Sequence, residues 1–261
     1  MGWMMGTVKL EMTCGTDTGQ VRSRNEDHVQ IVPHMGLAIL ADGMGGHRAG
    51  DVASQIAVDT ISEQWGRKYR DRGDPSGAIT GSRRSDELLS AVSAANEQIY
   101  TLSKNNPEFQ GMGATVIAVH FNRDGLCAVH LGDSRMYRYR RGSLHQVTTD
   151  HTHAQESVRL GLVSAEDAKG GYGWNLLLKA LGVDSAIEPD IIASPVEEGD
   201  IYLLCSDGLT DAINDPDIRT RIALGEDGLP NIVDELIDLA NQHGGPDNIS
   251  IVLIKVLALD D

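Results

Sequence analysis

Hydrophobic residues along this chain form short β-type runs that alternate with longer helical patterns. Apolar-rich runs, most of them bounded by glycine or aspartate, predict strands at residues 28–32, 37–41, 115–121, 126–131, 135–140, 144–147, 200–205 and 249–256. Apolar positions spaced by three and four predict helices at residues 49–65, 85–102 and 232–240. A polar, glycine-containing segment at about residues 67–85 separates the first two helices and predicts a surface loop.

One connection between predicted strands is short enough to indicate their relative direction. Residues 139–144, YRRGSL, have the length and the glycine of a tight hairpin, which pairs the flanking strands antiparallel. This pairing disfavours a doubly wound parallel sheet. We therefore expect an α+β fold in which antiparallel sheets pack face to face and helices cover the outside. A length of 261 residues with 41% apolar content suits one domain.

The overall charge narrows the classes of partner. The formal net charge of −16 repels nucleic acid, so we expect no nucleic-acid partner, and a phosphate-handling site needs local positive charge. No stretch of about 18 uncharged apolar residues occurs, so we expect no membrane span. The 3 cysteines are far apart and form no Cys-x-x-Cys pair, which disfavours a disulfide framework or a zinc cage. A cytoplasmic location is the resulting expectation.

Aspartates next to glycine, serine or asparagine recur at the ends of the predicted strands. They are Asp42 in "ADGM", Asp133 in "LGDS", Asp207 in "CSDG" and Asp247 in "GPDN". Taken singly, each also fits ordinary turn or helix-cap chemistry. If the strand ends converge, the like charges need a counter-charge, and hard divalent cations such as Mg²⁺ or Mn²⁺ prefer oxygen ligands. The pattern therefore predicts a carboxylate-lined metal site.

Motifs for other ligands do not occur in the chain. There is no Gly-x₄-Gly-Lys-Ser/Thr phosphate loop, no Gly-x-Gly-x-x-Gly sequence opening a helix and no Asp-x-Asp-x-Asp-Gly calcium loop. These absences argue against a nucleotide-binding or calcium-loop protein.

Seven segments, taken in their order along the chain, resemble the metal-dependent type 2C (PPM) serine/threonine protein phosphatases of the bacterial kind. They are TDTGQVRSRNED, ADGMGGHRAGDVAS, GMGATVIAV, LGDSRMYRYRRGSLHQVTTDH, LLKALG, LLCSDGLTD and GGPDNISIVLI. The resemblance implies a single catalytic domain over residues 1–261, built as a four-layer α-β-β-α sandwich with two antiparallel sheets flanked by helices. It also implies a two-metal site between the sheets at one edge and a mobile flap at about residues 151–176.

The resemblance also implies a set of metal ligands for two Mn²⁺ or Mg²⁺ ions. Asp42 is expected to bridge the ions, the Gly43 carbonyl to complete one coordination sphere, and Asp207 and Asp247 to bind the other ion. Asp133 matches the family residue that holds a third, weaker ion together with Asp207. An ordinary turn aspartate between two strands is the alternative for Asp133.

Two further residues match family positions outside the metal ligands. Arg22 matches the arginine that binds the substrate phosphate, since a planar fork of donors suits two phosphate oxygens. Glu26 matches a carboxylate that accepts hydrogen bonds from metal-bound water, and a charged surface turn is its alternative. Some family members carry a histidine where this chain has Met44, so the general acid is unassigned. The flap sequence KGGYGWNLLLKALG also departs from bacterial relatives.

The implied reaction is hydrolysis of phosphoserine and phosphothreonine by attack of a metal-bridging water, which reverses Ser/Thr kinase signalling. Phosphorylated proteins are the implied substrates, and a cognate Ser/Thr kinase is the implied partner. Two other classes are weighed against this enzyme. A phosphoprotein-binding pseudophosphatase would be expected to have lost Asp42, Asp207 or Asp247, and a nuclease should show a basic stripe for the nucleic-acid backbone.

Overall fold

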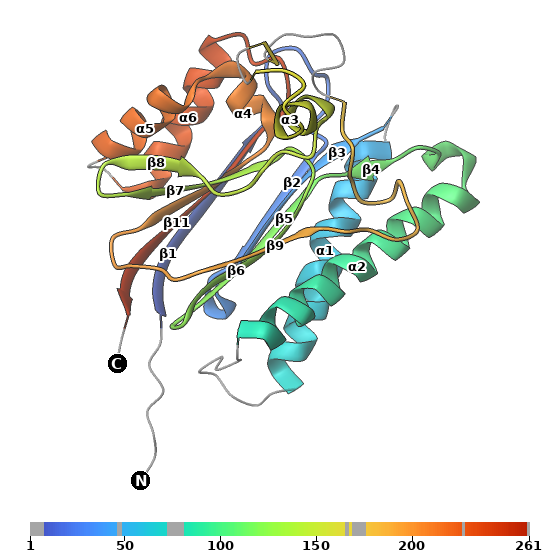
Figure 1. Cartoon of the computed structure of the whole chain (residues 1–261), viewed down its shortest axis with the longest axis horizontal. Coiled ribbons are helices and arrows are strands. Elements are labelled where there is room, and N and C mark those ends of the chain that lie inside the picture. Colours follow the sequence, from blue (N-terminus) through green and yellow to red (C-terminus); the bar gives the residue numbers. More distant parts are fainter. Residues whose placement is uncertain are drawn as a thin grey trace.

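Two antiparallel sheets lie face to face, with helices on both outer faces (Figure 1). A computed structural model describes residues 8–45, 49–71, 81–164, 167–168, 176–225 and 228–259. Helices from the first half of the chain cover one sheet, and helices from its C-terminal part cover the other. The predicted α+β, four-layer fold is therefore confirmed.

The first sheet has five strands, and all of its pairings are antiparallel. Their order is β1 (Val8–Asp17), β11 (Ile249–Leu259), β10 (Ile201–Cys205), β7 (Arg135–Arg140) and β8 (Ser143–Gln146). Arg141 and Gly142 have φ angles of 50° and 82° in the predicted hairpin between β7 and β8. These positive values are typical of a tight two-residue hairpin turn.

The second sheet is also antiparallel. Its order is β2 (Asp27–Val32), β3 (Leu37–Met44), β5 (Val116–Asn122), β6 (Gly125–Leu131) and β9 (Asp190–Ser194), with the short β4 (Gly113–Ala114) beside β3. Every residue of β5 and β6 is buried, because apolar side chains cover this sheet on both faces. That burial explains why both strands appear in the sequence as almost continuous apolar runs.

Three apolar layers hold the sandwich together. One lies between the second sheet and α1 (Ala49–Asp71) and α2 (Gly81–Asn105), and one lies between the two sheets. The third lies between the first sheet and α4 (Asp207–Ala212), α5 (Asp215–Leu224) and α6 (Leu229–Gln242). Helix α6 shows the pattern plainly, because its buried side chains recur at helical spacing: Leu229, Ile232, Val233, Leu236 and Ala240.

The boundaries predicted for the loop at about residues 67–85 are wrong at both ends. Helix α1 continues to Asp71 and α2 begins at Gly81, and residues 72–80 lie outside the described part of the chain. Ion pairs one helical turn apart accompany both extensions, because Arg67 contacts Glu63 at 3.1 Å and Arg83 contacts Glu87 at 3.1 Å. Residues 67–71 and 81–85 therefore belong to the two helices and not to a loop.

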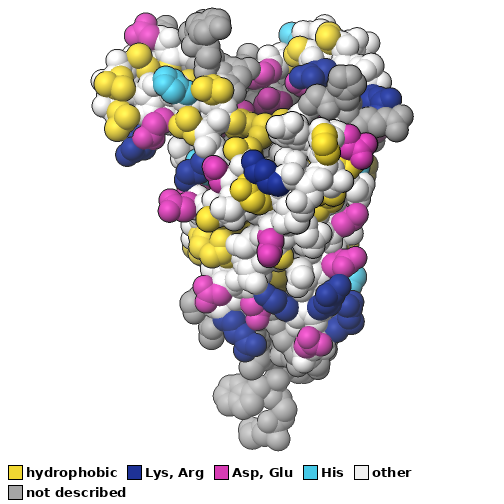
Figure 2. Space-filling view, turned by 90° about the vertical axis from the view of Figure 1, so that its right-hand side faces the viewer, with side chains coloured by type: hydrophobic (Ala, Val, Ile, Leu, Met, Phe, Trp, Pro, Cys, Tyr) yellow, Lys and Arg dark blue, Asp and Glu magenta, His cyan; other side chains and the backbone are white. Residues whose placement is uncertain are grey.

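The predicted flap at about residues 151–176 contains one short helix, α3 (His153–Arg159). Residues 165, 166 and 169–175 of this segment lie outside the described residues. Large apolar side chains on both sides of α3 in the sequence are exposed: Leu160, Leu162, Val163, Leu176 and Leu178. Hydrophobic side chains also gather at the upper end of the face shown in Figure 2. Among the described residues, no helix is both long and apolar enough to cross a membrane.

One connection between the sheets matters most for the site. The chain passes directly from β6 in the second sheet to β7 in the first, and Asp133 lies in the turn between them. Strand β3 ends near Asp42, β10 runs into α4 at Asp207, and β11 starts just after Asp247. The convergence of strand ends inferred from the sequence is therefore present at one edge of the sandwich (Figure 1).

Candidate active site

A cavity of about 210 Å³ lies between these strand ends. Its described lining includes all of the residues that the sequence predicted for the site: Arg22, Glu26, Asp42, Gly43, Asp133, Asp207 and Asp247. Met44, Thr115, Leu177 and Asn248 also line it. Figure 2 shows acidic side chains in a hollow at the upper end of the molecule. The structure brings the predicted residues together, while their individual roles stay predictions.

Asp42 is held through its backbone on both sides. It pairs with Asp27 across strands β2 and β3, and its N–H donates to Thr115 Oγ1 at 3.1 Å. The Thr115 N–H donates in turn to the Asp42 carbonyl at 2.8 Å. Because its main chain is fixed from both directions, the Asp42 carboxylate has little freedom to leave the cavity.

Two glycines let backbone segments approach closely beside the cavity. A Cβ at Gly43 would lie 2.1 Å from the Gly50 carbonyl oxygen, and one at Gly208 would lie 2.0 Å from the Asn248 carbonyl oxygen. Both distances are shorter than any real Cβ contact, so only glycine fits. The Gly43 N–H donates to the Glu26 carbonyl at 3.1 Å, which joins the predicted acidic position to the end of β3.

Asn248 joins the segments that carry Arg22, Glu26 and Asp247, and the sequence analysis did not identify it. Its Oδ1 accepts the Glu26 N–H at 2.8 Å, and its Nδ2 donates to the carbonyls of Thr18 at 2.9 Å and Arg24 at 2.8 Å. Its own N–H donates to Asp247 Oδ1 at 2.8 Å. The amide is suited to this position because it offers a donor and an acceptor together. The sequence signal was the Asp-Asn pair before the last strand.

A carboxylate that the sequence analysis did not place in the site, Asp27, pairs with Asp42 across β2 and β3. Asp27 is only 5% exposed, and its Oδ2 accepts the Ser206 hydroxyl at 2.8 Å. Its Oδ1 is buried and has no hydrogen-bond partner among the described residues. Its signal in the sequence was the acidic pair formed with Glu26.

Burial and crowding of like charges disfavour ionisation of the cavity carboxylates. Burial, followed by repulsion from neighbouring carboxylates, raises the pKa of Asp42 and of Asp207 well above the usual range. Burial also raises the pKa of Asp27 and of Asp133, each to about 6. A divalent cation would remove this penalty, because it supplies the counter-charge that the cluster lacks.

The donor set fits Mg²⁺ or Mn²⁺. Carboxylate oxygens of Asp42, Asp207 and Asp247 and the Gly43 carbonyl line one cavity, and hard divalent cations bind such oxygen donors. The orphaned oxygen of Asp27 points to the same need for positive charge. The residues present therefore fit the metal site that the sequence predicted.

Arg22 supplies positive charge at the cavity. Of the described residues that line it, only Arg22 carries a basic side chain. Its Nη2 donates to Asp247 Oδ2 at 2.6 Å, and this hydrogen bond raises the pKa of Arg22. The side chain is 53% exposed, so solvent and a ligand can reach it. Arg24 lines a neighbouring cavity of about 380 Å³ and not this one.

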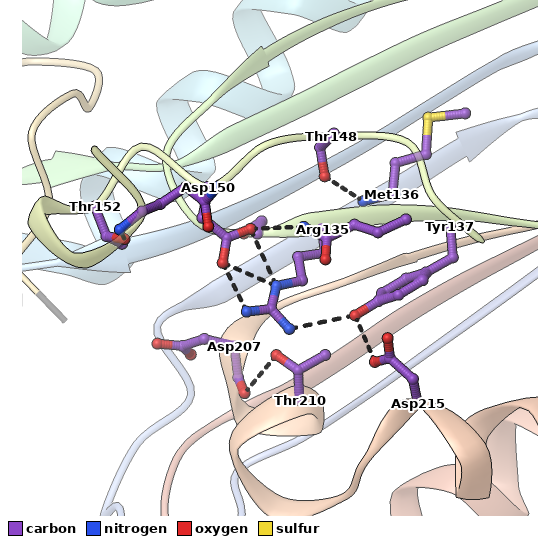
Figure 3. A network of polar contacts seen from close by, with 12 residues as sticks. Arg135, Met136, Tyr137, Thr148, Asp150, Thr152, Asp207, Thr210 and Asp215 are labelled. Carbon is purple, nitrogen blue, oxygen red and sulfur yellow. Dashed lines mark hydrogen bonds and ion pairs between the residues drawn. The ribbon is translucent and has the colours of Figure 1, made fainter. Parts of the chain in front are cut away.

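Asp133 and Asp207 also line a larger cavity of about 930 Å³. Arg135 lies in that cavity, but its guanidinium is engaged by Asp150, with Nη2 at 2.6 Å and Nε at 2.9 Å from Oδ2 (Figure 3). Its Nη1 also donates to the Tyr137 hydroxyl at 3.3 Å. Because these bonds neutralise and hold Arg135, it is less available than Arg22 for binding an anion.

Comparison with known proteins gives one family. The sequence model of the family described as Protein phosphatase 2C matches residues 14–250 of this chain. The serine/threonine phosphatase stp of Listeria welshimeri is 35% identical over 243 residues, covering 92% of this chain and 93% of that protein.

Solved structures agree with this result. The serine/threonine phosphatase PstP/Ppp of Mycobacterium tuberculosis has a TM-score of 0.85 at 35% identity, covering 96% of this chain and 100% of that one. The catalytic domain of PstP in complex with two manganese ions has a TM-score of 0.82 at 35% identity, covering 97% of this chain and 100% of that one.

The raised carboxyl pKa values predict how pH changes the stabilisation by metal. Such a group keeps its proton in the folded chain at pH values where the unfolded chain has lost it, with an unfolded pKa of about 4. In the metal-free protein, the protonated carboxyl favours the folded state. This contribution to the free energy of unfolding is fully present below about pH 4, and it is lost as the pH rises through about 6 for Asp27 and Asp133. A bound cation needs its carboxylate ligands ionised, and it offsets the charge of the carboxylates around them.

We therefore expect saturating Mn²⁺ to raise Tm more at about pH 7.5 than at about pH 5.5. Differential scanning calorimetry with Mn²⁺ or with chelator at each pH measures this difference, and the contribution of histidines cancels because it is present in both arms. Asp42→Asn should reduce the Mn²⁺ effect at both pH values. A Tm increase that does not depend on pH, or that Asp42→Asn retains, would contradict this account of the cavity.

Proposed function

The chain belongs to the protein phosphatase 2C family, and we propose that it hydrolyses phosphoserine and phosphothreonine in proteins at the cavity between the two sheets. It is a metal-dependent protein serine/threonine phosphatase that uses Mn²⁺ or Mg²⁺. The observation that carries the proposed site is the meeting of Asp42, Asp207 and Asp247 in one cavity beside Arg22.

The pseudophosphatase that the sequence left as an alternative is not supported. The relatives are named phosphatases, and the three aspartates are all present and line the cavity. The nuclease alternative would need a basic surface for the nucleic-acid backbone, whereas this chain carries a net charge of −16.

We assign the metal ligands as the sequence predicts. Asp42 and the Gly43 carbonyl would hold one ion, Asp207 and Asp247 the other, and Asp42 would be shared. When bound, the ions lower the pKa of water and neutralise charge on the transferring phosphoryl group. The buried backbone contacts of Asp42 and Asn248 hold the carboxylates in place before substrate arrives, which avoids reorganisation during the reaction.

Arg22 is proposed to bind the substrate phosphate. Its guanidinium offers donors in a planar fork, it is exposed at the mouth of the cavity, and it already contacts a carboxylate there. Glu26 is proposed to orient water through its carboxylate. Its main chain is fixed by Asn248 and by the N–H of Gly43, so the side chain begins from a defined position.

The proposal extends to the setting in which the enzyme acts. Phosphorylated Ser/Thr proteins are its substrate class, and a Ser/Thr kinase that writes those phosphates is its proposed partner in signalling. A cytoplasmic location is supported by Cys14, Cys127 and Cys205, which are free thiols in the structure, as expected in a reducing compartment.

The proposed activity is tested with two substrates and three metal conditions. We expect hydrolysis of a phosphothreonine peptide and of p-nitrophenyl phosphate with Mn²⁺ or Mg²⁺, because either ion fits the oxygen ligands. Exhaustive chelation should abolish both activities, and re-addition of Mn²⁺ should restore them. Phosphate release measured with malachite green follows both substrates, and turnover that survives chelation would refute the metal-dependent mechanism.

Arg22→Ala should raise KM for the phosphopeptide by about tenfold or more, because it removes a charge-assisted contact with phosphate. Any accompanying decrease in kcat measures how far that contact strengthens in the transition state. Arg24→Ala is the matched control, since Arg24 lies on the neighbouring cavity, and its KM should stay near the wild-type value. Equal KM values for both variants and wild type would remove Arg22 from the phosphate site.

Asp133→Ala tests the proposed role of Asp133 at the leaving group, as a ligand of the third, weaker ion that the family resemblance implies. The other proposed ligands remain, so phosphate should still bind. We expect kcat for the phosphopeptide to decrease about 100-fold or more, because its alkoxide leaving group needs protonation. The decrease should be smaller for p-nitrophenyl phosphate. Equal decreases for both substrates would argue against this role, and no decrease would leave Asp133 as a turn residue.

A further inference from the structure

Two neighbouring histidines contact the turn that carries Asp133, one of them buried and the other partly buried. His130 lies near the end of strand β6, and its Nε2 lies 3.0 Å from the Ser134 carbonyl oxygen. His151 precedes α3, and its Nδ1 lies 3.0 Å from the Gly132 amide nitrogen. The two rings stack with centroids 4.8 Å apart and an interplanar angle of 20°. Asp133 therefore lies in a turn whose flanking residues both contact a histidine ring.

The partners of His151 settle its tautomer. An amide N–H can only donate, so Nδ1 of His151 accepts the proton of Gly132 and carries none itself. The proton of the neutral ring is then on Nε2, which lies 3.4 Å from Asp190 Oδ1 on strand β9. Burial lowers the pKa of His151, which favours this neutral form. The carboxylate of Asp190 thus favours the tautomer that Gly132 requires.

His151 and Gly132 exchange two hydrogen bonds. Besides the bond to the ring, the His151 N–H donates to the Gly132 carbonyl at 2.8 Å. Gly132 has a φ angle of +115°, and a Cβ there would lie 2.6 Å from Thr115 Cβ. The turn is therefore held against Thr115, the residue that also fixes the backbone of Asp42. His151 holds the same turn through its two hydrogen bonds with Gly132.

His130, His151 and Asp190 could also be considered as a metal site, since one ligand atom from each lies within 4.8 Å of the others. The hydrogen bonds favour a different role. A metal at Nε2 of His151 would displace the proton that faces Asp190, while Nδ1 is already occupied by the Gly132 amide. The stacked rings also direct their in-plane lone pairs along nearly parallel planes and not toward one point.

We propose that His151 is a positioning residue of the active site, which holds the turn bearing Asp133 and acts on the reaction only through that carboxylate. The inference rests on the proposed role of Asp133 at the leaving group. Loss of the ring acceptor would free the Gly132 amide and let Asp133 move, whereas Arg22 and the ligands Asp42 and Asp247 would keep their own contacts. The expected defect is therefore confined to kcat for substrates with poor leaving groups.

Two substitutions of similar size separate the acceptor from the bulk of the ring. In His151→Asn the side-chain oxygen can take the place of Nδ1, whereas in His151→Gln the amide reaches the place of Nε2 instead. We expect His151→Gln to lower kcat for the phosphothreonine peptide about 10- to 100-fold, with a smaller decrease for p-nitrophenyl phosphate and an unchanged KM. His151→Asn should recover most of that activity. His145→Asn, on an exposed residue of β8, is the matched control and should behave as wild type.

Hydrogen exchange of the Gly132 amide gives a readout that does not depend on turnover. In the chelated protein it should be faster in His151→Gln than in wild type and in His151→Asn, with similar Tm values for all three. Identical exchange in the Asn and Gln variants would overturn the proposed hydrogen bond. An equal decrease in kcat for both variants would overturn the positioning role.

A double variant distinguishes this inference from the proposed function beneath it. If His151 acts through Asp133, adding His151→Gln to Asp133→Ala should cause no further decrease in kcat. A further decrease equal to that of His151→Gln alone would refute the inference and leave the role of Asp133 intact. If Asp133→Ala itself shows no defect that depends on the leaving group, both the role of Asp133 and the positioning role of His151 are refuted.

Discussion

Buried carboxylates of like charge are the constraint on which this structure depends. Burial raises the pKa of both Asp42 and Asp207, and the charges of Asp27 and Asp133 raise it further. A fold selected for stability alone would gain by replacing such a group of charges with apolar residues. The cluster is consistent with a protein whose stability and activity both draw on bound cations.

The rest of the site serves to hold these groups where repulsion would otherwise separate them. Thr115 bonds both sides of the Asp42 main chain, and Asn248 ties the segment containing Glu26 to the start of β11. Close backbone approaches at Gly43 and Gly208 bring the strand ends within reach of one another. Hydrogen bonds that end on main-chain groups thus give the site a definite shape before a ligand binds.

The features that the sequence predicts correctly are those that depend on residues close together in the sequence. Strands β5 and β6 are covered on both faces, so their apolar runs are unmistakable, and an aspartate at the end of such a run is visible in the sequence. Strand β9 was missed because it is mostly exposed, and its pattern does not alternate cleanly. The linking role of Asn248 depends on partners more than 220 residues away in sequence, which no local pattern contains. Polar residues at 67–71 and 81–85 were assigned to a loop, although they belong to the ends of α1 and α2.

Because the chain passes directly from β6 to β7, the spacing between the two sheets affects the distances between the carboxylates of the site. Asp42 belongs to one sheet, Asp207 follows the other, and the turn bearing Asp133 spans the layer between them. That layer includes Phe121 and Tyr202, whose rings meet edge to face at 5.2 Å. A change of side-chain volume there would alter the separation of the carboxylates without touching the cavity. Adaptation of this enzyme to heat or cold could therefore alter its turnover through the interior of the sandwich.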